Sequence, residues 1–117
     1  MPSAAATELL QRVVSTAMRT ACNTDLADIV ELLRRTRHEH PETTVAALSH
    51  VGHFLVLDRV GGGLAAAVHV RVDGSRGRVG MLTLAPDLRR SGIAERMVGV
   101  AEAVCTALGC TEVDRTG

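Results

Sequence analysis

The second half of the chain contains three apolar runs separated by glycine-bearing turns, and this pattern constrains the fold more than any other feature. The runs cover residues 53–58, 64–72 and 78–85. Short apolar segments bounded by Gly, Asp and Pro are typical of β-strands, and Asp73-Gly74 is a strong hairpin signal. The triple glycine at 61–63 predicts the other turn and not a phosphate-binding loop, because no helix follows it. The chain is therefore expected to build a sheet.

Three other segments show helical periodicity. An apolar stripe at i, i+3, i+4 and i+7 starts at Leu26 and predicts a helix over residues 25–37, with the polar residues 22–25 supplying its N-cap. Pro41 suits the first position of a helix and predicts a short one over residues 41–50. A broader stripe predicts a helix over residues 93–108, closed by a glycine.

A strand over residues 13–21 and a last strand over residues 110–113 complete the expected order, β-α-α-β-β-β-α-β. This order predicts one α+β domain over residues 13–117, with a mixed, mostly antiparallel sheet flanked by helices, after a flexible N-terminus at residues 1–12. Phe54 is the only aromatic residue, so the core is expected to be aliphatic.

The composition is that of a globular domain, and it narrows the possible functions. Apolar residues make up 46% of the chain and the formal net charge is zero, which argues against a disordered chain and against nucleic-acid binding. No apolar run is long enough to span a membrane, and residues 1–8 do not have the pattern of a signal peptide. Three cysteines without close metal spacing to histidines fit a reduced, cytoplasmic protein.

Residues 82–109 contain the strongest indication of function in the sequence. There a strand leads through a proline-bearing turn and the sequence Arg-Arg-Ser-Gly at residues 89–92 into a helix. Backbone N–H groups at a helix N-terminus lack partners and attract anions. Gly92 and Ala94 lack bulk, so a diphosphate can approach the backbone, while the arginines add charge and Ser91 adds a cap or a donor. The sequence predicts an anion-binding loop.

These residues resemble the acetyl-CoA signature of the GNAT superfamily of N-acetyltransferases, which reads Arg/Gln-x-x-Gly-x-Gly/Ala. Here the signature is Arg89-x-x-Gly92-x-Ala94, preceded by a strand with a proline turn and followed by a helix that contains Ala-Glu-Ala at residues 101–103. The resemblance extends over residues 13–114. An ordinary strand–turn–helix with solvated arginines is the alternative interpretation of the same segment.

The resemblance implies where acetyl-CoA would bind. The diphosphate of CoA would contact the backbone amides of residues 89–94, and the pantetheine arm would pair with residues 82–84 beside a bulge in the strand. The N–H near Leu84 would polarise the thioester carbonyl. The cofactor-binding residues implied in this way are Leu82, Thr83, Leu84, Arg89, Arg90, Ser91, Gly92, Ile93 and Ala94.

The resemblance also implies an activity, the direct attack of an amine on acetyl-CoA or another short acyl-CoA. Family members usually continue with another helix and two more strands that often carry a tyrosine acid. This sequence contains no tyrosine and is short of those elements at its C-terminus. A homodimer or a partner chain is expected to complete the acceptor side. The alternative is a non-catalytic CoA-binding or protein-interaction module with the same fold.

Candidates for the catalytic groups are few, and the sequence assigns none. Glu112 and Asp114 would share one face of the last strand, where they could act as bases or be solvated carboxylates. His69 could face the cleft or be a hydrogen-bonded histidine. Glu39 and Glu42 mildly favour a cationic amine as the acceptor, bound near the first two helices.

The remaining histidines and cysteines are not expected to bind a metal. Four histidines crowd the region of the second helix without the spacing of a metal site: His38, His40, His50 and His53. Cys105 lies on an apolar stripe and is expected to be buried. Cys110 follows the end of that helix and could be exposed enough to oxidise.

Overall fold

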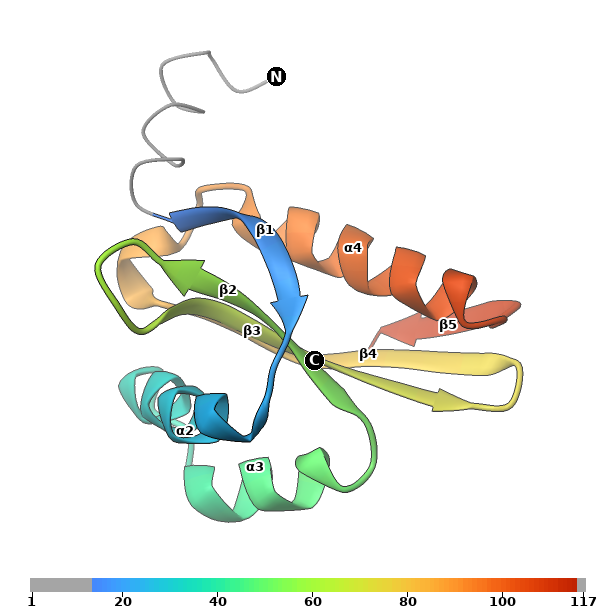
Figure 1. Ribbon diagram of the computed structural model, residues 1–117, viewed down its shortest axis with the longest axis horizontal. Coiled ribbons are helices and arrows are strands. Elements are labelled where there is room, and N and C mark those ends of the chain that lie inside the picture. Colours follow the sequence, from blue (N-terminus) through green and yellow to red (C-terminus); the bar gives the residue numbers. More distant parts are fainter. Residues whose placement is uncertain (1–13, 116–117) are drawn as a thin grey trace.

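The structure is a computed structural model, and it describes residues 14–115. The flexible segment expected at residues 1–12 lies outside the described residues. The elements are, in chain order, β1 (Val14–Thr20), η1 (Asn23–Asp25), α2 (Leu26–Arg35), α3 (Pro41–Ser49), β2 (His53–Arg59), β3 (Leu64–Asp73), β4 (Arg76–Leu84), η2 (Pro86–Leu88), α4 (Ile93–Ala107) and β5 (Glu112–Arg115). Figure 1 shows α2 and α3 on one face of the sheet and α4 on the other.

The sheet has the strand order β1-β2-β3-β4-β5. Its first four strands pair antiparallel with their neighbours, and β5 pairs parallel to β4. This arrangement confirms the predicted α+β class, the order of the elements and the mostly antiparallel sheet.

Local interactions explain where the boundaries differ from the prediction. α2 ends at Arg35 because the hydroxyl of Thr36 donates to the carbonyl of Leu33 at 3.0 Å and Arg37 then adopts a φ of 63°. β5 starts later than predicted because the N–H of Cys110 donates to the carbonyl of Cys105 at 3.0 Å, which closes the end of α4 first.

β4 contains a bulge just beyond the residues that pair with β5. The register between β3 and β4 shifts by one residue between the pairs Ala67↔Thr83 and His69↔Gly80, and Met81, which lies in the bulge, has a φ of 49°. β5 pairs only with residues 76–79 of β4. Within the described part of the chain, residues 82–84 of β4 therefore have a strand on the β3 side alone. We refer to residues 82–84 as the open edge.

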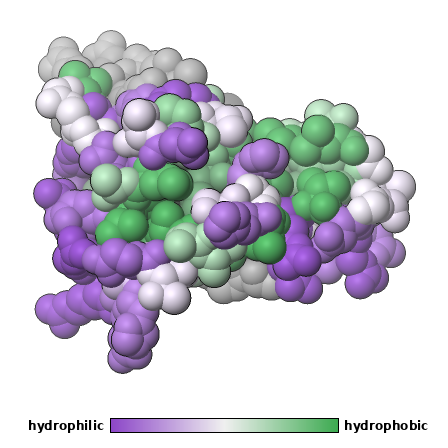
Figure 2. All heavy atoms as spheres, turned by 60° about the horizontal axis from the view of Figure 1, so that its bottom comes forward, coloured by the Kyte–Doolittle hydropathy of each residue, from purple (hydrophilic) through white to green (hydrophobic). Residues whose placement is uncertain are grey.

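The core is aliphatic, as predicted. Its most deeply buried large side chains come from α2, β2, β3 and α4: Ile29, Leu33, Val56, Leu57, Val68 and Met97. Burial of a side chain of this size contributes about 1.5–3 kcal/mol to folding. Hydrophilic side chains cover much of the face that Figure 2 presents, with hydrophobic areas between them.

α4 packs on β4 at Gly77, and this contact corrects one expectation. A methyl group at Gly77 would lie 2.8 Å from the Sγ atom of Cys105 and 3.2 Å from that of Cys110. Both cysteines are buried. The expected exposure of Cys110 is wrong, because the chain reverses at Gly109, which has a φ of 96°, and returns the next side chain to the sheet.

One arginine joins β1 to the start of α2 and to β2. Arg19 forms two hydrogen bonds with the carboxylate of Asp25, at 2.7 and 2.8 Å, and two with that of Asp58, both at 2.8 Å. Asp25 also accepts the backbone N–H of Cys22 at 2.8 Å. The Arg19 guanidinium and this N–H hold the pKa of the buried Asp25 carboxyl well below its usual range. Asp25 therefore fixes the turn before α2, and its side chain accepts no capping hydrogen bond from the N-terminus of that helix.

We expect Asp25→Asn to lower the free energy of unfolding at neutral pH by about 1–3 kcal/mol, because charge-assisted bonds to a buried carboxylate are lost. The folded pKa lies below the unfolded value of about 3.9, so this stabilisation is complete above that value and is lost as the pH falls toward the folded pKa. Denaturant titrations from about pH 7 to about pH 2.5 should show the gap between wild type and variant narrowing in acid.

The control is Asp114→Asn, which removes an exposed carboxylate of β5. Its stability should stay within about 0.5 kcal/mol of wild type. A gap between wild type and Asp25→Asn that does not change with pH would contradict the role given to this carboxylate.

Gly77→Ala should destabilise the protein by about 1–3 kcal/mol, because the new methyl group overlaps Cys105 and displaces α4 from the sheet. Gly99→Ala is the matched control, since this α4 glycine has open space around it. That change should stabilise the helix by up to about 1 kcal/mol. Equal unfolding midpoints for Gly77→Ala and wild type would show that α4 does not pack closely there.

Candidate functional site

The open edge presents backbone groups that no other strand of residues 14–115 uses. The N–H of Ala85 donates to the carbonyl of Ala65 at 2.8 Å, and Thr83 keeps the same register with β3. Backbone groups alternate in direction along a strand, so those of Thr83 and Ala85 face β3. The N–H and C=O groups of Leu82 and Leu84 therefore point away from β3, into the space beyond the open edge.

Two cavities border the open edge. The α2-side cavity, of about 270 Å³, is lined by Thr36, His38, Leu82, Thr83, Leu84 and Arg89. The α4-side cavity, of about 330 Å³, is lined by Leu82, Ala94, Glu95, Val98 and Arg115. Since Leu82 borders both, the two cavities reach the same stretch of strand from opposite faces of the sheet.

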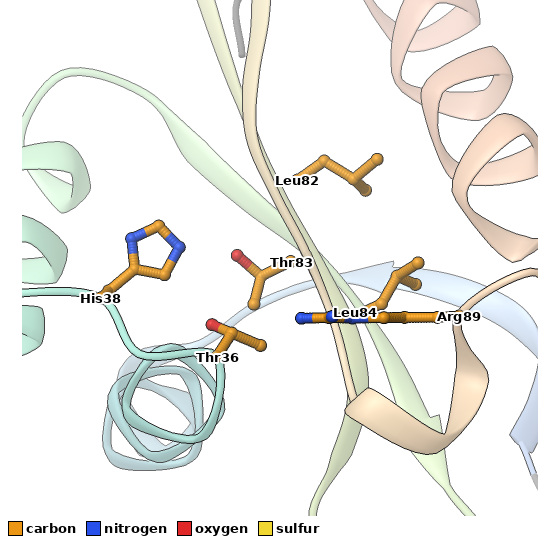
Figure 3. Close-up of a pocket in the computed structure, with 6 residues that line it drawn as sticks. All are labelled: Thr36, His38, Leu82, Thr83, Leu84 and Arg89. Carbon is orange, nitrogen blue, oxygen red and sulfur yellow. The ribbon is translucent and has the colours of Figure 1, made fainter.

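Side chains from three segments converge on the α2-side cavity (Figure 3). Thr36 and His38 come from the end of α2 and the residues after it, and Thr83 comes from β4. Figure 3 shows Arg89 extending from the segment before α4 back toward β4, while Leu82 points toward α4. The cavity thus combines apolar walls with two hydroxyls, an imidazole and a guanidinium.

The loop between η2 and α4 is shaped by two left-handed residues. Arg90 has a φ of 64° and Gly92 has a φ of 84°. The hydroxyl of Ser91 donates to the carbonyl of Leu88 and accepts the N–H of Ile93 at 3.4 Å. Ile93 is buried and anchors the start of the helix. The loop is therefore fixed to the core at both ends.

Several backbone donors of this loop have no acceptor in residues 14–115. They are the N–H groups of Arg90, Gly92 and Ala94. Unpaired N–H groups in a loop with left-handed residues, at the positive end of a helix dipole, form a binding site for an anion. Gly92 leaves the backbone open to a ligand, since nothing lies within 4 Å of where its Cβ would be.

The fold brings together the two groups of residues that the resemblance assigned to acetyl-CoA. Residues 82–84 form the open edge, and residues 89–94 form the loop at the N-terminal end of α4, which is called the head of α4 below. Arg89 also lines the α2-side cavity, together with Thr36 and His38. Sequence reasoning did not place either residue beside β4, because nothing in the local pattern after a helix indicates contact with a strand far along the chain.

The carboxylates considered as bases lie away from both cavities. Glu112 pairs with Arg76 at 3.0 Å, and Asp114 lies opposite Arg78. Both are exposed, and they sit on the part of β5 that pairs with β4 before the bulge. This placement is that of solvated surface carboxylates.

His69 is a hydrogen-bonded histidine of the interior, which confirms one of the two alternatives. Its Nε2 lies 2.9 Å from the carbonyl oxygen of Leu48, and its ring packs against Phe54 with the centroids 5.1 Å apart. Burial lowers the pKa of His69. His69 does not line either cavity at the open edge.

Within residues 14–115, no three side chains of His, Cys, Asp or Glu are grouped so that they could hold a metal ion. In that part of the chain, no helix is long and apolar enough to cross a membrane.

Comparison with known proteins relates this architecture to one family. Residues 26–116 match the acetyltransferase (GNAT) family. No curated protein matches the sequence.

Solved structures with the same fold are similar to this chain at low sequence identity. An aminoglycoside N-acetyltransferase in complex with CoA aligns with a TM-score of 0.72 and 14% identity, over 91% of this chain and 79% of its own. Glucosamine-6-phosphate N-acetyltransferase from Arabidopsis thaliana aligns with a TM-score of 0.70 and 16% identity, over 86% and 81%. An acetyltransferase from Trypanosoma brucei aligns with a TM-score of 0.70 and 14% identity, over 86% and 82%.

In the folded protein, His69 should titrate below the usual histidine value of about 6.5, because burial opposes the charged ring. A lowered folded pKa means that stability is complete above the unfolded pKa and falls as the pH drops below it. An NMR titration of the imidazole signals, assigned with His69→Gln, would measure this pKa. A value at or above the usual one would contradict a buried, neutral ring.

Proposed function

Because the chain belongs to the acetyltransferase (GNAT) family, we propose that it transfers an acetyl or another short acyl group from acyl-CoA to an amine acceptor. One observation carries the proposal. The open edge of β4 leads, through one short segment, to the unpaired N–H groups at the head of α4. A similar protein, the aminoglycoside N-acetyltransferase, is in complex with CoA.

Residues 89–94 suit the diphosphate of CoA. A diphosphate needs several convergent donors, and this loop supplies backbone N–H groups, the positive end of the α4 dipole and the charge of Arg90. Ala94 lines the α4-side cavity. In this proposal the pantetheine arm therefore runs from the loop through that cavity to residues 82–84.

The backbone of Leu84 would stabilise the transition state. Its N–H would donate to the thioester oxygen, on which negative charge grows as the amine nitrogen attacks the carbonyl carbon. A C–N bond forms, the C–S bond breaks, and its electron pair leaves with sulfur as the thiolate of CoA. The nitrogen loses a second proton as the amide forms, and the thiolate takes up this proton directly or through water. Most of the rate would come from holding both reactants in register at the open edge.

Few side chains near the open edge could accept or donate the protons that move in this reaction. The amine has to attack in its neutral form, so its ammonium proton must leave first. His38 lines the α2-side cavity and is the candidate that receives this proton, directly or through water. The chain contains no tyrosine, so the thiolate would leave without a tyrosine acid. A thiol such as that of CoA has a pKa of about 8.5, so its thiolate is stable enough to leave without prior protonation.

A second copy or a partner chain would cover the remaining apolar surface. β5 is an edge strand with exposed residues in the described sheet, and exposed edges favour association. An apolar cavity of about 490 Å³ between β2, β3 and α4 is bordered by the exposed side chains of Val51 and Leu108. We propose a homodimer, and place it in the cytoplasm because the three cysteines are free.

The same surface favours the second candidate function, a module that binds CoA or a protein partner without transferring an acyl group. The two candidates share the fold and differ in turnover. A module of this kind would release no CoA from acetyl-CoA in the presence of any amine.

Acetyl-CoA should raise the thermal midpoint of the wild-type chain. At about a hundredfold excess over Kd, a ligand of the native state adds about 2.7 kcal/mol, which is a shift of several degrees in a small domain. Gly92→Glu should abolish the shift, because a carboxylate then occupies the anion site. Calorimetry measures both, since the chain has no Trp or Tyr for fluorescence.

Gly74→Glu is the matched control. Gly74 also has a positive φ, of 60°, but it lies in the β3–β4 turn, at the opposite end of β4 from the loop. Both variants should have lower midpoints than wild type because of backbone strain, and only Gly74→Glu should keep the acetyl-CoA shift. A wild-type chain without any shift would refute acyl-CoA binding.

A further inference from the structure

Two buried thiols lie next to each other where the end of α4 packs on β4. A methyl group at Gly77 would lie 2.8 Å from the Sγ atom of Cys105 and 3.2 Å from that of Cys110, so both sulfur atoms approach the same point of the strand. Burial, and after it the neighbouring Cys110 thiol, which is within hydrogen-bond distance, raises the pKa of Cys105. The proposed acyl transfer uses neither thiol.

The cap of α4 creates this pair. The N–H of Cys110 donates to the carbonyl of Cys105, and the N–H of Gly109 donates to that of Thr106, both at 3.0 Å. With Gly109 at a φ of 96°, these two bonds form a Schellman motif. The first and last residues of such a motif frequently make an apolar contact. Here both are cysteine, so the backbone of the helix end holds the two sulfur atoms together.

The third cysteine has a different environment. Cys22 is exposed, and its Sγ atom lies 3.0 Å from the hydroxyl oxygen of Thr24 and 3.2 Å from a carboxylate oxygen of Asp25. These neighbours belong to the turn before α2, and α2 and α4 cover opposite faces of the sheet (Figure 1). Cys22 therefore provides an internal reference for a thiol that a reagent reaches freely.

A local opening of the helix end would expose the buried pair to a reagent. Residues 106–109, which separate the two cysteines, are all exposed, and Cys110 itself is 7% exposed. The end of a helix opens at a much lower free energy than the whole domain. A small oxidant can therefore reach the two thiols without global unfolding, but more slowly than it reaches Cys22.

We propose that Cys105 and Cys110 are a redox-active dithiol, which a low-molecular-weight disulfide converts into an intramolecular disulfide that fixes the end of α4 in its cap. In a reducing cytoplasm the pair stays in the dithiol form, and an excess of the oxidised small thiol drives the conversion.

The conversion takes two exchange steps. One cysteine, as its thiolate, attacks a sulfur atom of the small disulfide, so a mixed disulfide forms and one small thiol leaves. The other cysteine then attacks the protein sulfur of the mixed disulfide and releases the second small thiol. The protein loses two electrons and two protons, and the small disulfide gains them and ends as two thiols.

The bond would act on stability and not on the cofactor site. α4 has 15 residues, so its two ends lie about 20 Å apart at a rise of about 1.5 Å per residue. A ring over residues 105–110 therefore leaves the loop at the head of α4 unchanged. The inference is independent of the proposed function for this reason.

The test treats the folded wild-type protein overnight with an excess of oxidised glutathione, followed by alkylation of free thiols and digestion with trypsin. Cleavage after arginine places both buried cysteines in one peptide, residues 97–115, and Cys22 in another, residues 20–34. Mass spectrometry should show that peptide 97–115 has lost two hydrogen atoms and resists alkylation. Peptide 20–34 should carry one glutathione, which shows that the oxidant was active.

Three variants assign the bond to this pair. Cys105→Ala and Cys110→Ala should each leave one thiol that takes up glutathione or is alkylated. In wild type, oxidation should raise the thermal midpoint by a few degrees, because the ring restricts the unfolded chain. Neither variant should show this rise. Cys22→Ala is the matched control and should keep both the lighter peptide and the rise.

The outcomes that overturn the proposal are visible in the wild-type protein, which needs no substitution to fold. Two alkylated thiols or two glutathiones in peptide 97–115, after Cys22 has reacted completely, would refute the redox-active dithiol. A bond between the two peptides would do the same. A fall of the midpoint on oxidation would show that the bond strains the helix end and would overturn its stabilising role. Acetyl-CoA should shift the midpoints of the oxidised and reduced proteins equally, and absence of any shift would refute only the proposed function.

Discussion

The bulge at Met81 is the constraint on which the site depends. One extra residue in β4 shifts its register against β3, just beyond the residues of β4 that pair with β5. A non-glycine residue at positive φ is strained by roughly 1–3 kcal/mol, so the surrounding sheet has to hold it in place. The bulge also sets which backbone groups face β3, so that those of Leu82 and Leu84 point to the open edge.

The second requirement is that the head of α4 stays beside this edge. Close packing of Cys105 on Gly77 fixes the far end of the helix against β4, and the buried Ile93 fixes the near end. Asp87 of η2 forms an ion pair with Arg59, the last residue of β2, which joins the segment before the loop to the end of that strand. The distance and orientation between the unpaired N–H groups of the loop and the open edge are therefore fixed. A long ligand that binds along both needs such a rigid arrangement.

Local patterns were sufficient to predict the order of the elements, because strand periodicity, turn glycines and helix caps act over a few residues. The triple glycine lies in the β2–β3 turn, Asp73 ends β3 with Gly74 in the turn that follows, and Pro41 begins α3. Boundaries moved where a single contact competed with the pattern, as at Thr36 and Cys110. The sequence also predicted the strand–turn–helix at residues 82–109 in which the loop with unpaired N–H groups lies, since glycine and alanine at a helix start are a local signal.

The sequence by itself determined which segments become strands and helices and where backbone donors are left without partners. Only the tertiary structure decided that Arg89 shares a cavity with Thr36 and His38, that His69 bonds to Leu48, and that Glu112 and Asp114 stay at the surface. These contacts join residues far apart in the chain. They depend on strand register and on how α2 and α4 pack against the sheet, which local periodicity does not specify.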